Sequence, residues 1–242
     1  MRRMRFFLAI GAALLLLPSA GCSEKLSRQT GLTDADLFAR AEKMSGRRKY
    51  ADASESYQVL LERFPTSPLA PRAQFGLASS RMANKEEAEA EAAFDDFLRL
   101  YPSDPKVPDA LFRKGILLSG QVLPPGRDQQ KTRDAIRAFT QFSEKAPGSP
   151  LAAQAAEKVR ALRDRLALHE AAVVKSFLSR KLYDSAEARA RRAISAYPDV
   201  PAAPALLSLL AESLERQGKT DEAGAFRKTL SEKSPGQGGG KR

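Results

Sequence analysis

The phrase Pro-x-x-Pro recurs four times along this 242-residue chain and restricts what the chain can fold into. The first proline of each copy ends a helix, because it lacks an N–H and its ring clashes with the preceding turn. The second begins a helix, so Ser67, Asp104 and Ser149 are expected to be N-caps with proline at the first helical position. The copies lie at 65–68, 102–105, 147–150 and 198–201. A repeated stop and start predicts helical hairpins stacked side by side.

Small residues stand at one fixed place in every unit and at a second place in units one, two, three and five. Helix axes can approach to about 8 Å only where the facing side chains are small. The first place lies twelve positions before each proline stop and holds Ala53, Ala90, Ala135, Ala186 and Ala223. The second place holds Ala41, Ala78, Gly115 and Ala211. This spacing resembles the tetratricopeptide repeat, so we predict an all-α fold, a right-handed solenoid of about five tetratricopeptide-like hairpins over residues 33–233.

Two irregularities interrupt the predicted array. Gly115 lies twenty residues before Ala135, where twelve is normal, and the extra residues fall within 121–130. This segment contains Pro-Pro-Gly and is expected to protrude as a loop. The run from Leu151 to about Lys181 has no Gly or Pro and predicts one helix of about 45 Å. Its expected buried stripe is Ala155, Val159, Leu162, Leu166, Val173 and Phe177.

The N-terminus has the layout of a secretory signal peptide over residues 1–21. Three arginines precede an apolar run of twelve residues, too short to cross a bilayer. Small residues and then Cys22 follow, which resembles the lipobox of bacterial lipoproteins and predicts acylation of that thiol. The alternative is a plain signal peptide with an incidental free thiol. Ser23, rather than aspartate, follows the cysteine and favours sorting to the outer membrane. Residues 22–32 are expected to form a flexible tether and residues 234–242 a disordered tail.

Charge and motif content exclude several classes of function. Three of the 40 basic residues lie in the predicted signal peptide, so the remainder has 37 basic against 29 acidic residues. No zinc cluster, RNA-recognition signature or aromatic-basic stripe occurs, so we expect no nucleic-acid partner. His169 is the only histidine, and no phosphate loop or metal motif is present, so we expect no enzyme, no metal and no cofactor. His169 is expected to be solvated or to face a partner.

Basic residues are dense around the predicted fourth hairpin. An arginine guanidinium can form two parallel hydrogen bonds with a carboxylate, so the cluster favours an acidic partner. The alternative is that these residues only lie on solvated helix faces. The cluster consists of Arg160, Arg163, Arg165, Arg180, Lys181, Arg189, Arg191 and Arg192.

Two segments resemble the BamD family of outer-membrane assembly lipoproteins. One is Arg127-Asp128-Gln129-Gln130, followed by Ala135, Phe139 and Phe142; the other is Leu162-Arg163-Asp164-Arg165-Leu166-Ala167, followed by Glu170. Arg189 falls where that family has an arginine that contacts the periplasmic POTRA domain of the barrel-forming subunit. The resemblance places the other candidate partner-binding residues nearby, at Arg192, Arg165, Arg163, Asp128 and Arg127.

The resemblance implies a non-enzymatic, lipid-anchored scaffold of the β-barrel assembly machinery that faces the periplasm from the outer membrane. The last three repeats are then expected to hold a BamA-like barrel-forming subunit. The first two are expected to receive the C-terminal segment of unfolded β-barrel substrates. Two alternatives stay open: a pilotin-like lipoprotein that escorts a secretin or pilus component, and a coordinator tied to the Tol system or to peptidoglycan synthesis.

Overall fold

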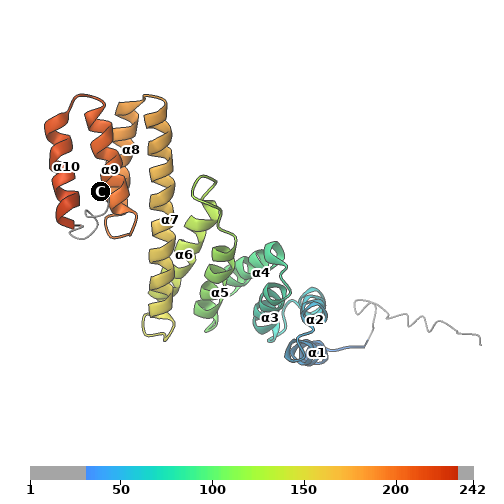
Figure 1. Ribbon diagram of the computed structural model, residues 1–242. Helices are drawn as coiled ribbons and strands as arrows, with labels where there is room; N and C mark the ends of the chain where they lie inside the picture. The colour runs from blue at the N-terminus through green and yellow to red at the C-terminus, as the bar shows by residue number, and fades with distance from the viewer. Residues whose placement is uncertain (1–30, 234–242) are drawn as a thin grey trace, which may run out of the picture.

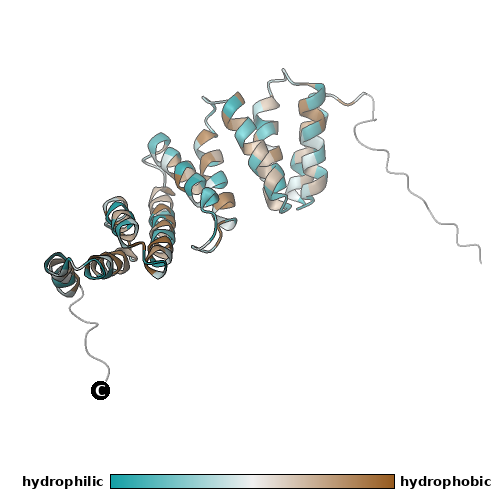
Figure 2. Ribbon diagram, turned by 90° about the horizontal axis from the view of Figure 1, so that it is seen from above, coloured by the Kyte–Doolittle hydropathy of each residue, from teal (hydrophilic) through white to brown (hydrophobic). Residues whose placement is uncertain are grey.

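The computed structural model describes residues 31–233, which form ten α-helices and no strand. Five antiparallel hairpins follow one another from α1 to α10, which lie at opposite ends of an elongated array (Figures 1 and 2). This confirms the predicted all-α fold of five hairpins. The predicted signal peptide, Cys22, most of the tether and the tail lie outside the described residues. The helices are α1 (Asp34–Gly46), α2 (Tyr50–Arg63), α3 (Ala70–Ala83), α4 (Glu87–Leu100), α5 (Val107–Gly120), α6 (Gln130–Lys145), α7 (Ala152–Ser179), α8 (Tyr183–Ala196), α9 (Ala203–Glu215) and α10 (Thr220–Lys233).

The first helices of successive hairpins form one layer of the array. Helix α1 contacts α3, α3 contacts α5, and α7 contacts α9, whereas each second helix packs mainly between its own partner and the next hairpin. A residue that recurs at the same place in α1, α3 and α5 therefore lines a continuous surface.

The Pro-x-x-Pro turns stop helices as predicted but start them two residues later than expected. Phe64, which precedes Pro65, has a φ of −131° and a ψ of 57°, outside the helical region, and α2 has already ended at Arg63. The Ser67 hydroxyl accepts the N–H of Leu69 at 3.0 Å, as a cap does, but the Ser67 carbonyl accepts the N–H of Ala70 at 2.9 Å. This i+3 bond closes a separate tight turn, so α3 begins at Ala70 and not at the proline.

The same turn recurs after α4 and α6. Asp104 accepts the N–H of Lys106 at 2.7 Å, and Ser149 accepts the N–H of Leu151 at 3.2 Å. The predicted positions of these three residues as N-caps of α3, α5 and α7 are therefore wrong, although each side chain makes the hydrogen bond of a cap.

The small residues lie at the helix contacts, as predicted. Ala53, Ala90, Ala135, Ala186 and Ala223 are fully buried. Gly115 faces the ring of Phe139, and a Cβ on that glycine would lie 2.7 Å from a ring carbon. The hairpins are therefore held together by close approach of backbones at these positions.

Overpacking one of these contacts should destabilise the array. Ala90→Leu and Ala135→Leu each add a branched side chain where no space exists, and we expect a loss of about 1–3 kcal/mol in the free energy of unfolding. The effect is measured as a lower midpoint in chemical denaturation. A matched control is Ala153→Leu on the exposed start of α7, which should leave the midpoint unchanged. Unchanged midpoints for both buried variants would contradict the observed packing.

Helix α7 has 28 residues, against 16 in α6 and 14 in α8, and links two hydrophobic cores. Its 28 residues span about 42 Å, in agreement with the predicted long helix. The first core runs from Leu37 to Leu162 and the second from Ala167 to Ala223. The predicted buried stripe is wrong in the second half, where Ala167, Ala171 and Val174 are buried and Val173 and Phe177 are only half-buried. The buried face changes because α6 covers the first half of α7 while α8 and α9 cover the second.

Candidate protein-interaction surface

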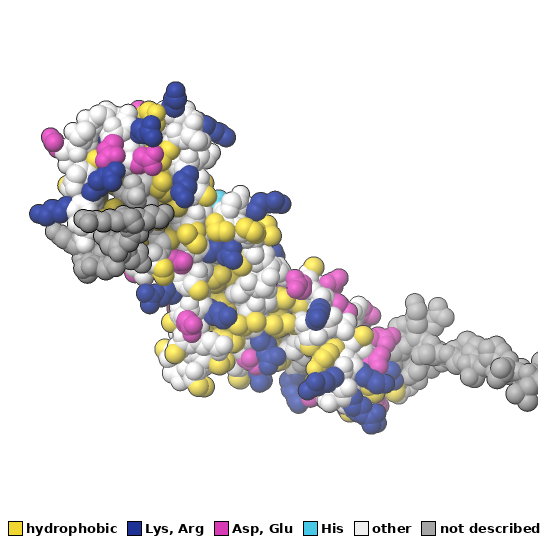
Figure 3. All heavy atoms as spheres, viewed as in Figure 1, with side chains coloured by type: hydrophobic (Ala, Val, Ile, Leu, Met, Phe, Trp, Pro, Cys, Tyr) yellow, Lys and Arg dark blue, Asp and Glu magenta, His cyan; other side chains and the backbone are white. Residues whose placement is uncertain are grey.

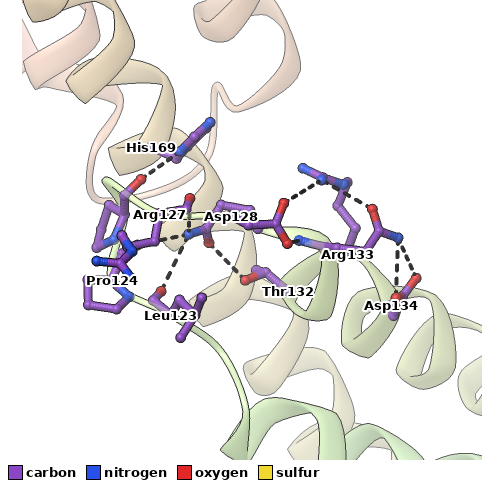
Figure 4. A network of polar contacts seen from close by, with 11 residues as sticks. Leu123, Pro124, Arg127, Asp128, Thr132, Arg133, Asp134 and His169 are labelled. Carbon is purple, nitrogen blue, oxygen red and sulfur yellow. Dashed lines mark hydrogen bonds and ion pairs between the residues drawn. The ribbon is translucent and has the colours of Figure 1, made fainter.

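The inserted loop between α5 and α6 is folded around one buried side chain. Gln129 is only 1% exposed, and its amide nitrogen donates to the carbonyls of Leu123, Pro124 and Arg127 at 3.4, 3.0 and 3.1 Å (Figure 4). Its amide oxygen accepts the hydroxyl of Thr132 at 2.8 Å. Residues 121–129 form a loop, as predicted, and this loop has a fixed internal structure.

Helix α7 holds the same loop from outside. Arg165 donates to the carbonyl of Leu123 at 2.7 Å. The Nδ1 of His169 donates to the carbonyl of Pro125 at 2.6 Å (Figure 4). His169, expected to be solvated or to face a partner, is half-buried and is held by this hydrogen bond to the loop. The guanidinium of Arg165, a predicted partner-binding group, is also engaged within the chain.

The neighbouring residues of α7 hold the turn between α8 and α9. Arg163 donates to the carbonyl of Ala196 at 3.1 Å and pairs with Asp199 at 2.7 Å. The carboxylate of Asp164 accepts the N–H of Ala202 at 2.7 Å. Arg163, Asp164, Arg165 and His169 therefore fasten both flanking connections where the two cores meet. We call these four residues the α7 clamp.

Arg189 lies on α8 and faces α7. Its guanidinium forms a two-pronged ion pair with Glu170, with Nη2 2.9 Å from Oε1 and Nε bonded to Oε2. The side chains of Arg189 and Glu170 are 34% and 19% exposed. Burial, followed by the nearby negative charge of Glu170, raises the pKa of Tyr197. Arg189 thus sits in a partly buried acidic and aromatic setting within its own chain.

The remaining predicted partner-binding residues are exposed. Asp128 caps the start of α6 by accepting the N–H of Gln130 at 3.0 Å and lies 3.9 Å from Arg133. Arg127 and Arg192 make no side-chain hydrogen bond or ion pair within residues 31–233 and remain accessible. The structure therefore directs Arg163 and Arg165 to opposite flanks of α7, and leaves Arg127 and Arg192 accessible on other helices and loops.

A row of aromatic and cationic side chains lines the N-terminal layer and was missed by the sequence reasoning. Phe38, Phe75 and Phe112 occupy the same place in α1, α3 and α5, and the signal was their identical spacing along the chain. The guanidinium of Arg72 lies 4.5 Å from the centre of the Phe38 ring, and that of Arg113 lies 5.3 Å from the Phe75 ring. We call these five residues the Phe–Arg row.

An apolar groove of about 420 Å³ lies between the last three helices. It is lined at the end of α8 by Ile194, at the start of α9 by Pro204 and Leu207, and on α10 by Phe226. The C-terminal hairpins therefore combine an apolar groove with exposed and partly buried arginines.

Glu187 makes the C-terminal hairpins sensitive to acid. Its carboxylate pairs with Lys219 at 2.8 Å and Arg191 at 2.9 Å and accepts from Gln217 at 2.9 Å. These contacts, the bond to Lys219 first, lower its pKa from 4.5 to about 2. Because the folded pKa is the lower one, the stabilisation is complete above about pH 4.5 and is lost as the pH falls towards 2.

We therefore expect the thermal midpoint, followed by circular dichroism, to fall over this pH range. Glu187→Gln should lower the midpoint at neutral pH and reduce its further loss in acid. Glu144→Gln on exposed α6 is the matched control and should retain the wild-type pH profile. A Glu187→Gln profile that parallels the wild type would contradict this role of the carboxylate.

Within residues 31–233 there is no group of three or more His, Cys, Asp or Glu side chains that could hold a metal ion. No helix in the same region has the length and apolar character needed to span a bilayer.

Comparison with known proteins gives a consistent result along the whole array. Residues 31–230 match the model of the YfiO family, described as outer membrane lipoproteins. Outer membrane protein assembly factor BamD of Neisseria meningitidis serogroup A is 27% identical over 246 residues, covering 97% of this chain and 92% of that protein. BamD of Vibrio cholerae is 25% identical over 211 residues, covering 83% and 88%. Among solved structures, MamA has 16% identity and a TM-score of 0.43, covering 84% of this chain and 92% of that one.

Proposed function

This chain belongs to the YfiO family of outer membrane lipoproteins and is an outer membrane protein assembly factor, and on that premise we propose that it works as a non-enzymatic scaffold facing the periplasm. The observation that carries the proposal is the family match over residues 31–230, which covers all five hairpins. We propose that acylation of Cys22 anchors the chain to the outer membrane. The ten helices then present two surfaces, one at each end of the array.

The C-terminal surface is proposed to bind the POTRA domain of a BamA-like subunit. The α7 clamp supports this assignment, because it fixes the connections on both sides of α7 and so presents α7 and α8 as a rigid platform. Arg189 supplies a partly buried cation, and the apolar groove beside α9 supplies area for burial. Interfaces gain most of their affinity from such arginine and apolar anchors at their centres.

The N-terminal surface is proposed to receive the C-terminal segment of unfolded β-barrels. The Phe–Arg row supports this, because it lines the layer formed by α1, α3 and α5. Arg72 is exposed and makes no ion pair within the described chain, so it can meet a peptide carboxylate. The Nε of Arg113 forms an ion pair with Oδ1 of Asp109 at 3.0 Å. The half-buried ring of Phe75 can contact an apolar side chain of the bound segment, whereas Phe38 and Phe112 are buried in the core beneath this layer.

Affinity purification from detergent-solubilised membranes tests this function. A tagged chain should recover the barrel-forming subunit as its main partner. A chain with Arg189→Glu should recover less of it, and a chain with Arg72→Glu should recover the wild-type amount, because that change lies at the other end of the array. Recovery of a secretin or of Tol components, without the barrel-forming subunit, would overturn the proposal.

A further inference from the structure

Four of the five turns within the hairpins share one backbone geometry that favours glycine, the exception being the longer α5–α6 loop. In the α1–α2 turn the N–H of Lys49 bonds to the carbonyl of Met44 at 2.9 Å, and Arg48 between them has a φ of 58°. Lys85 and Lys181 occupy the same place after α3 and α7, with φ values of 63° and 61°. Only the α9–α10 turn uses glycine there, at Gly218. Glycine is the usual residue at this left-handed position, whereas three of these turns carry a basic residue there.

The α1–α2 turn carries the highest density of free positive charge. Lys43, Arg47, Arg48 and Lys49 are all exposed, and none forms an ion pair with a residue of the described chain. We call these four residues the basic corner. Figure 3 shows Lys and Arg side chains gathered at the end of the molecule formed by α1 and α2. The turn after α3 differs, because Glu86 and Glu87 directly follow Lys85.

We propose that the basic corner binds the anionic headgroups of a phospholipid bilayer and orients the helical array on the membrane. The inference rests on the proposed anchor at Cys22. The eleven residue-to-residue steps from Cys22 to Thr33 span at most about 40 Å, so the first hairpin is the part of the array that the anchor holds near the bilayer. A tether alone limits the distance between the first hairpin and the bilayer and leaves the orientation of the helical array free. Clustered lysines and arginines beside a lipid anchor supply the second contact, since each is attracted to a negative membrane surface.

The charge pattern favours a membrane over an acidic peptide. The four cations surround a projecting turn in which every side chain is exposed. The turn can therefore present its charge to a flat surface, and it has no groove that would enclose a peptide. Their attraction to headgroups should depend strongly on salt, because exposed charges are screened over about 10 Å at moderate ionic strength.

Vesicle co-sedimentation tests the proposal with the mature chain from residue 22, carrying Cys22→Ala so that no acyl chain contributes. The protein should bind vesicles of phosphatidylethanolamine with phosphatidylglycerol, bind phosphatidylcholine vesicles weakly, and be released by high salt. The variant with Lys43→Gln, Arg47→Gln, Arg48→Gly and Lys49→Gln should bind the anionic vesicles about tenfold more weakly or worse. Arg48→Gly alone removes one charge and relieves the turn, and should weaken binding about threefold to fivefold.

Lys85→Gly is the matched control, because it makes the same change at the same backbone position next to two glutamates. It should leave vesicle binding unchanged. Circular dichroism should show that all variants keep the helical fold, with Arg48→Gly as stable as the wild type or more so.

Unchanged binding by the fourfold variant would overturn the proposal. Failure of the wild type to bind anionic vesicles would also overturn it and would point to an acidic protein partner. Mass spectrometry of Cys22 and the co-purification experiment test the anchor and the assembly function separately.

Discussion

Replacing Arg189 with glutamate should abolish tight binding to the periplasmic domain of the barrel-forming subunit while the helical array stays folded. If Arg189 meets a carboxylate of the partner, charge reversal replaces attraction with repulsion and costs about 2–5 kcal/mol of binding free energy. This corresponds to about a 30-fold to several-thousand-fold rise in Kd. An exposed arginine outside the interface would cost well under about 1 kcal/mol. Titration of the purified POTRA domain against both proteins measures the difference.

The ion pair between Arg189 and Glu170 requires a second variant, because charge reversal also places two carboxylates side by side within the chain. Glu170→Gln removes the same intrachain ion pair and keeps the arginine. If Arg189 contacts the partner, Glu170→Gln should bind as tightly as the wild type or more tightly, since the guanidinium is released. If Arg189 only fastens α8 to α7, the two variants should lose stability and affinity together. Equal affinities of wild type and Arg189→Glu, with unchanged circular dichroism, would remove Arg189 from the interface.

Replacing Cys22 with alanine should release the protein from the membrane fraction. Acyl chains contribute about 0.8 kcal/mol for each buried CH₂, so loss of several chains removes far more free energy than any other single change in this chain. The basic corner alone should hold the variant only at low salt. Fractionation in high salt, followed by immunoblotting, measures the release. Ser23→Ala, next to the cysteine, is the control and should stay in the membrane fraction.

The outcome of the Cys22 experiment separates the two alternatives at the N-terminus. Mass spectrometry of the mature protein should find lipid on residue 22. An unmodified N-terminus, together with unchanged fractionation of Cys22→Ala, would favour the plain signal peptide over the lipoprotein signal.

The sequence predicted the hairpins well because the prolines that end the helices act on residues next to them in the chain. A proline acts on the residue before it and on the preceding turn, so the ends of α2, α4, α6 and α8 followed directly from its position. The starts of α3, α5 and α7 were misplaced by two residues, because the choice between an α-helical and a tighter first turn depends on which N–H the Ser67 or Asp104 carbonyl accepts. That choice is a property of the folded backbone.

The candidate surface was harder to predict, since its residues are paired across hairpins. The sequence placed Arg163, Arg165 and Arg189 in one basic cluster and could not distinguish cations held within the chain from accessible ones. Arg165 reaches a carbonyl 42 positions away, and His169 reaches one 44 positions away. Helical periodicity contains no information about contacts at that separation. The recurrence of phenylalanine in α1, α3 and α5 could have been found, because it follows the repeat length.

The division between the two cores at α7 has a consequence for how the protein unfolds. The first apolar cluster ends at Leu162 and the second begins at Ala167, and the polar α7 clamp bridges the boundary. Hydrogen exchange under native conditions should then show two cooperative units, α1 to α6 and α8 to α10, that open with different free energies. Amide protons at the two ends of α7 should each follow the unit they pack against. A helix that is continuous in space would thus belong to two separate steps of unfolding.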